Sequence, residues 1–114
     1  MLVLLIEFSD MAHIAADTQA VVNSRVFGDG TGGAPKESLR NFYRRSSYDQ
    51  LEITGNVLGW YPAPTTRSGV TQTTAGRQAL IKEALSYYDG LGHDFSQYDN
   101  DGDGQIDYFA VVWT

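Results

Sequence analysis

Residues 99–107 read DNDGDGQID, and they constrain this chain more than any other stretch does. Four aspartates and two glycines share this one short turn. Packing like charges so closely costs Coulomb energy unless a cation neutralises them. The spacing D-x-D-x-D-G matches the first half of an EF-hand calcium loop. The stretch therefore predicts a turn that binds calcium, and an ion-free Asp- and Gly-rich surface turn is the alternative.

The EF-hand pattern gives a ligand role to alternate residues of the turn. Positions 1, 3 and 5 supply side-chain oxygens, position 7 supplies its backbone carbonyl, and position 9 often acts through water. The predicted metal ligands are Asp99, Asp101, Asp103, Gln105 and Asp107. Position 12 is Ala110 where an EF-hand has a bidentate glutamate. We therefore expect weak binding, on the order of 10⁻⁴–10⁻³ M, unless a remote residue such as Asp94 completes the shell.

The residues after the turn distinguish it from an EF-hand, in which a helix follows. Residues 106–113 read IDYFAVVW, and β-branched and aromatic residues dominate them. That composition predicts a strand. We therefore expect a calcium turn that leads into a strand.

Hydrophobic patterning predicts the other elements. The apolar run at residues 2–8 predicts a strand that is covered on both faces. Helical spacing of apolar residues predicts helices over 35–46 and 75–88, and a short helix is one interpretation of residues 17–25. Residues 27–35 contain a G-x-G-x-G-G run. No strand precedes this run and no Lys-Ser/Thr pair follows it, which favours a surface loop over a phosphate-binding loop.

Residues 50–61 alternate between polar and apolar side chains as strands do. A hairpin that turns at Gly55-Asn56 is one interpretation, and a single strand with a glycine bulge is the other. The order of the predicted elements is β-α-β(β)-α-β. This order predicts an α/β fold with a mixed sheet and flanking helices.

Length and composition exclude several classes of protein. The chain has 114 residues, enough for one domain or part of one. A net charge of −6 and the absence of a basic stripe argue against nucleic-acid binding. The chain has no cysteine, which excludes disulfides, thiol nucleophiles and Cys-based zinc sites. No apolar run approaches the roughly 20 residues of a membrane span. If the protein is secreted, we expect its signal peptide to lie upstream of residue 1.

Four stretches together resemble one family. They are VLLIEFSD at 3–10, SLRNFY at 38–43, LEITGNV at 51–57 and GHDFSQYDNDGDGQIDYF at 92–109. They resemble the peptidase M6 family, the immune inhibitor A-like secreted zinc metalloproteases. The resemblance covers nearly the whole chain, and its most specific part is 94–109. It implies a zincin-like, extracellular catalytic domain that binds calcium and cleaves proteins or peptides.

The resemblance also implies a helix with the motif H-E-x-x-H, in which two histidines bind zinc and the glutamate acts as general base. That motif does not occur in this chain. We therefore expect residues 1–114 to be the N-terminal part of the catalytic domain, with the zinc ligands elsewhere and no catalytic residue here. A non-enzymatic calcium-binding module with a protease-like fold is the alternative function, and the sequence beyond residue 114 discriminates between the two.

Two histidines remain to be assigned, His13 and His93. Neither has a partner at a one-turn helical spacing, which favours surface or hydrogen-bonded roles over zinc binding. A His13–Asp10 pair and a Glu7–Asp10 carboxylate pair are weaker alternatives. The apolar side chains of residues 108–113 would also leave a patch for self-association where nothing covers the last strand.

Overall fold

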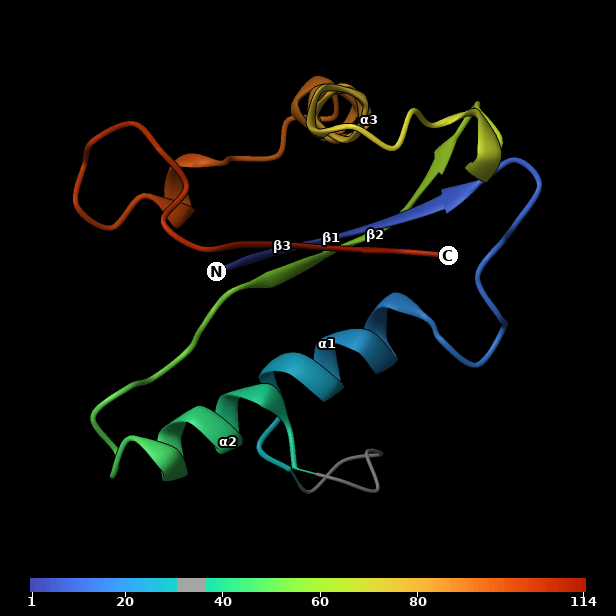
Figure 1. Ribbon diagram of the computed structural model, residues 1–114. Helices are drawn as coiled ribbons and strands as arrows, with labels where there is room; N and C mark the ends of the chain where they lie inside the picture. Colours follow the sequence, from blue (N-terminus) through green and yellow to red (C-terminus); the bar gives the residue numbers. More distant parts are fainter. Residues whose placement is uncertain (31–36) are drawn as a thin grey trace.

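The computed structural model describes residues 1–30 and 37–114, which form an α/β domain with helices on both faces of a sheet (Figure 1). The elements in chain order are β1 (Leu2–Phe8), α1 (Gln19–Phe27), α2 (Leu39–Ser46), β2 (Asn56–Ala63), α3 (Thr74–Gly90) and β3 (Phe109–Trp113). Short 3-10 turns occupy Arg67–Gly69 and Ser96–Tyr98. No helix among the described residues is long and apolar enough to cross a membrane.

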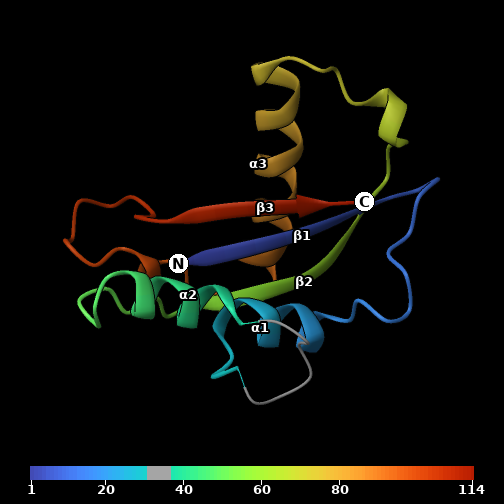
Figure 2. The ribbon, with the colours of Figure 1, turned by 60° about the horizontal axis from the view of Figure 1, so that its bottom comes forward.

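The three strands pair in the order β2-β1-β3, and both pairings are parallel (Figure 2). Leu2 lies opposite Asn56 on one side and Phe109 on the other, and the β1–β2 register shifts between Leu4 and Ile6. The prediction of a mixed sheet is therefore wrong for the described strands. Helices connect the strands, and parallel strands require such long crossovers.

Neither interpretation of residues 50–61 fits the structure, because no hairpin turns at Gly55-Asn56 and no long strand runs through Gly55. Residues 51–55 form no strand, and a single strand begins at Asn56. Gly55 passes close to the first residue of the chain: a Cβ at this position would lie 1.7 Å from the Met1 carbonyl oxygen. Glycine is needed here for close backbone approach, and it does not form a hairpin turn.

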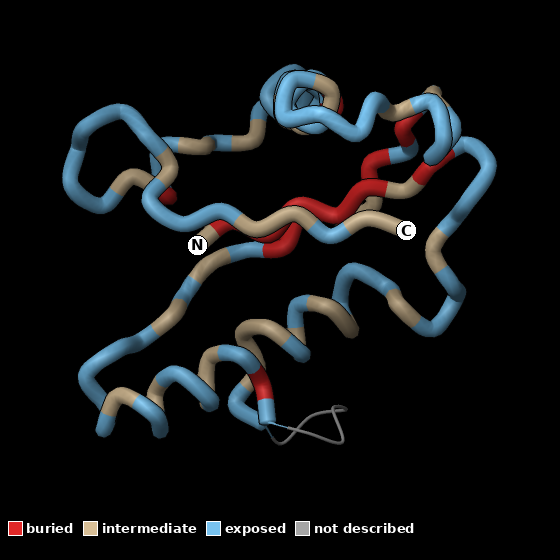
Figure 3. Tube along the Cα trace, viewed as in Figure 1, coloured by how far each residue is buried: buried red, intermediate tan, exposed pale blue. Residues whose placement is uncertain are grey.

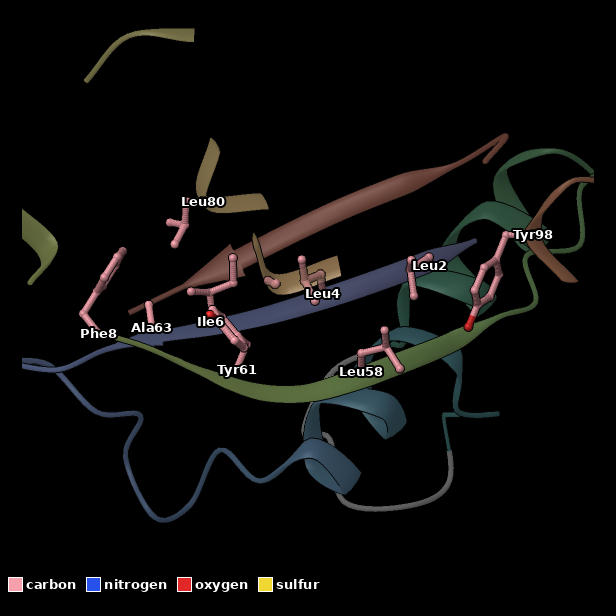
Figure 4. Packing of buried hydrophobic residues seen from close by; sticks show 10 residues of the cluster. Leu2, Leu4, Ile6, Phe8, Leu58, Tyr61, Ala63, Leu80 and Tyr98 are labelled. Atoms are coloured by element: carbon pink, nitrogen blue, oxygen red, sulfur yellow. The ribbon is translucent and has the colours of Figure 1, made fainter. Parts of the chain in front are cut away.

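The core lies on both faces of β1, as the continuous apolar run predicts. On one face, Leu2, Leu4, Ile6 and Phe8 pack with side chains of β2 and α3 (Figure 4). On the other face Val3 and Leu5 pack with β2 and α1. Buried residues accordingly concentrate along the central strand (Figure 3). Each such leucine stabilises the fold by about 1.5–3 kcal/mol relative to an exposed one.

Each helix begins after a hydroxyl-bearing residue that caps it. The side chains of Thr18, Ser38 and Thr73 accept hydrogen bonds from backbone N–H groups in the first turns of α1, α2 and α3. The cap at Ser38 makes α2 begin at Leu39, later than the predicted helix at 35–46. The start of that predicted helix and much of the predicted glycine-rich loop at 27–35 lie outside the described residues.

Candidate metal centre

The acidic turn lies at the amino end of the sheet, between the 3-10 turn at Ser96–Tyr98 and strand β3 (Figure 1). Buried contacts hold both of its ends. The Tyr98 side chain is buried, and its hydroxyl hydrogen-bonds to Asn56 at 3.2 Å and to His93 at 2.9 Å. At the other end the backbone N–H of Leu2 donates to the Tyr108 carbonyl at 2.9 Å. The turn is therefore exposed, but core residues fix where it enters and leaves.

Three carboxylates of the turn converge. Asp99, Asp101 and Asp107 each offer an oxygen, and these oxygens lie within 4.8 Å of one another. Calcium binds oxygens at 2.3–2.6 Å, so two ligands of one ion lie no more than about 5 Å apart. These three aspartates can therefore bind a single cation. Because the group is exposed, solvent can supply the remaining ligands.

Asp99 also organises the backbone of the turn. Its carboxylate accepts hydrogen bonds from the backbone N–H groups of Gly102 at 2.7 Å, Asp103 at 3.1 Å and Gly104 at 2.8 Å. These bonds, chiefly the one from Gly104, hold the pKa of Asp99 below its usual range. Gly102 and Gly104 have φ angles of +76° and +81°, which glycine adopts without strain.

The other predicted ligands lie differently. The Asp103 carboxylate accepts hydrogen bonds from the backbone N–H of Gln105 at 2.8 Å and from its side chain at 3.0 Å. Asp103 is not in the converging group, and neither is Asp94, whose carboxylate accepts two hydrogen bonds from Ser96. The structure thus brings together three of the predicted side-chain ligands and leaves Asp103 outside. The pattern supplies the spacing of these residues but does not fix their side-chain conformations.

One contributor to the site was not predicted. The backbone N–H of Asn100 donates to the Asp107 carboxylate at 2.9 Å, and the Asn100 side-chain amide donates to the same oxygen. Asn100 thereby holds Asp107 beside Asp99 and Asp101. The D-x-D-x-D-G pattern leaves this position unspecified, so the sequence carries no signal for it.

The histidines take the hydrogen-bonded roles that the sequence favours. His13 bonds to Glu7 at 2.7 Å, and His93 bonds to Tyr98. The structure pairs His13 with Glu7, and the Asp10 carboxylate accepts from the backbone N–H of Arg67 at 2.8 Å, in place of the alternative pairs with Asp10. Within residues 1–30 and 37–114, the acidic turn holds the one group of three or more His, Asp or Glu side chains placed to share a metal.

A cleft of about 760 Å³ lies beside the turn. Its lining comes from α2, the segment before β2, the turn and the start of β3, and it includes Leu39, Tyr43, Ile53, Asn100 and Phe109. These residues come from separate segments without a shared pattern, so the sequence does not predict the cleft.

The chain was compared with models of known protein families and with curated protein sequences, and neither comparison gave a match.

Proposed function

We propose that this chain is the N-terminal part of the catalytic domain of an extracellular zinc endopeptidase similar to the peptidase M6 family, with a structural calcium ion bound by its acidic turn. The observation that carries the proposal is the convergence of Asp99, Asp101 and Asp107 within the stretch that most resembles that family. The α/β domain, with helices on both faces of its sheet, is compatible with a zincin-like domain.

The donor set fits calcium. Carboxylate oxygens are hard ligands, and calcium accepts six to eight of them in flexible geometry, whereas magnesium demands a near-ideal octahedron. Three converging carboxylates repel one another unless a cation neutralises them. Bound calcium would fix the turn and thereby the direction in which the chain enters β3. Because the ion binds the folded turn, it would stabilise the domain by mass action.

The described residues do not fit a zinc site. The chain has two histidines, which bond to Glu7 and Tyr98 and do not join a common group of ligands. Under the proposal, zinc binding and peptide hydrolysis belong to a segment outside this chain. The role of residues 1–114 is to supply the sheet and the calcium turn that support that segment.

An assay of the full-length gene product tests the proposal. Purified full-length protein is expected to cleave casein in the presence of calcium and zinc, and a zinc chelator is expected to abolish cleavage. The 114-residue chain is expected to cleave nothing under the same conditions. A full-length protein that lacks H-E-x-x-H and does not cleave casein would contradict the protease proposal. It would favour the alternative function, a non-enzymatic calcium-binding module.

A further inference from the structure

The segment that joins β1 to α1 leaves the carboxyl end of the sheet and folds back toward α1 (Figure 1, blue loop). We call residues 9–18 the strap. None of its residues is buried, and Ile14 is 66% exposed. A segment without buried apolar side chains opens locally at low free-energy cost. A few polar and aromatic contacts must therefore hold the strap in place.

The first of these contacts is with Glu7, the one residue of β1 that is not fully buried. One carboxylate oxygen of Glu7 accepts from the backbone N–H of His13 at 3.1 Å and lies 2.7 Å from the Nδ1 atom of its ring. Hydrogen bonding from His13 holds the pKa of Glu7 below its usual range. The carboxylate is therefore ionised at neutral pH and accepts hydrogen bonds only, so His13 donates from Nδ1.

The second contact is with Trp60 on β2. The His13 ring stacks on the indole with centroids 4.8 Å apart and planes 6° from parallel. The indole N–H donates to the Asp17 carbonyl at 2.8 Å. One tryptophan thus holds the strap at two places, near its middle and near its end.

The other charged groups of this region have partners of their own. The Asp17 carboxylate pairs with Arg25 of α1 at 2.7 Å. The Asp10 carboxylate accepts from the backbone of Arg67, which follows β2. The His13 ring itself contacts the Glu7 carboxylate of β1 and the uncharged indole ring of Trp60 on β2.

We propose that the strap is a pH-sensitive element whose attachment to the sheet tightens when His13 gains a proton. A protonated imidazole donates a charge-assisted hydrogen bond to ionised Glu7, which is stronger than the bond from a neutral ring. A cation stacked on an indole face gains further attraction. Protonation therefore strengthens both contacts at once. Loss of the proton loosens the strap and favours the form in which Trp60 and Glu7 are exposed.

Hydrogen exchange of the whole chain, saturated with calcium, tests this proposal. Protection of the strap is measured at about pH 5.5 and 7.5, on either side of the usual histidine titration, and corrected for the intrinsic exchange rate at each pH. We expect about threefold to tenfold higher protection at the lower pH, the gain from making a partly exposed hydrogen bond charge-assisted. Protection of residues 2–8 in the same samples is the internal reference and is expected to change much less.

Two variants locate the effect. His13→Phe keeps an aromatic ring on Trp60 but cannot gain a proton, so its strap is expected to show equal protection at both pH values. His93→Gln removes the other histidine and is expected to retain the response. Equal strap protection in the wild-type protein at both pH values would overturn the proposal, as would an equal change in residues 2–8. A pH response that persists in His13→Phe would also overturn it.

Discussion

The hydroxyl of Tyr61 on β2 donates a 2.7 Å hydrogen bond to the carboxylate of Glu83 on α3. The bond ties the long helix to the sheet across the larger part of the core. Burial of the phenol, followed by the bond to Glu83, raises the pKa of Tyr61 to about 12.

This shift predicts a loss of stability in alkali. Because the folded-state pKa of Tyr61 lies above the unfolded value of about 10, its contribution is complete below pH 10 and disappears as the pH rises toward 12. Tyr61→Phe removes the ionisable group and is expected to lose less stability over this interval. Urea unfolding of both proteins at pH 8, 10 and 11 measures the difference. Parallel decreases in the two proteins would contradict the prediction.

The converging carboxylates predict that Asp101 contributes to calcium binding and that Asp103 does not. Calcium at about ten times its dissociation constant is expected to stabilise the wild-type chain by about 1.4 kcal/mol. Asp101→Ala should abolish most of this stabilisation because it removes a ligand oxygen from the converging group. Asp103→Ala is the matched control, and its response should stay close to wild type because Asp103 bonds to Gln105.

Thermal unfolding with and without calcium distinguishes these outcomes. A shift of several degrees in the wild type and in Asp103→Ala, but not in Asp101→Ala, supports the geometry of the turn. Equal losses in the two variants would favour the full EF-hand ligand set, in which Asp103 also binds the ion.

The lowered pKa of Asp99 predicts how the turn responds to acid without metal. Its hydrogen bonds require the ionised carboxylate, so their contribution is complete above the usual aspartate pKa and is lost as the pH falls through the lowered value. The amide resonance of Gly104, whose N–H donates to Asp99, should therefore stay constant from pH 7 to about 4 and move below that. A shift already centred near pH 4 or above would contradict the prediction.

Truncation in the central strand should cost the most stability. Leu4 is fully buried between its neighbours, and Leu4→Ala is expected to destabilise the fold by about 2–5 kcal/mol. Leu91→Ala is a control of the same chemistry at a position that is 68% exposed, and its cost should stay within about 0.5 kcal/mol. Chemical unfolding of the two variants checks this contrast.

The sequence predicts a helix or strand correctly where the hydrophobic pattern within that segment is sufficient to specify it. The apolar run of β1 and the helical spacing of α3 are signals of this kind, and both elements form close to their predicted bounds. Residues 51–54 alternate like a strand, but contacts outside the segment decide their structure. Arg40 and Arg44 of α2 bind Glu52, and Ser47 accepts from the backbone of Leu51.

The same limit applies to the candidate site. The spacing of aspartates predicts a turn that gathers carboxylates, because spacing is a property of sequence. Which carboxylates meet depends on side-chain conformations that local hydrogen bonds select. Gln105 engages Asp103 and Asn100 positions Asp107, and neither preference is visible in the D-x-D-x-D-G pattern.

The position of β1 between β2 and β3 has a consequence for how the domain assembles. Leu2 pairs with Asn56 and also with Phe109, which lies almost at the other end of the chain. During synthesis β1 therefore waits for its second neighbour until the chain has been made as far as Phe109–Trp113. Pairings so distant in sequence form slowly, because loop-closure entropy is lost before the contacts are gained. Until β3 arrives, one edge of β1 keeps its backbone N–H and C=O groups unpaired, and these groups can pair with a strand of another chain.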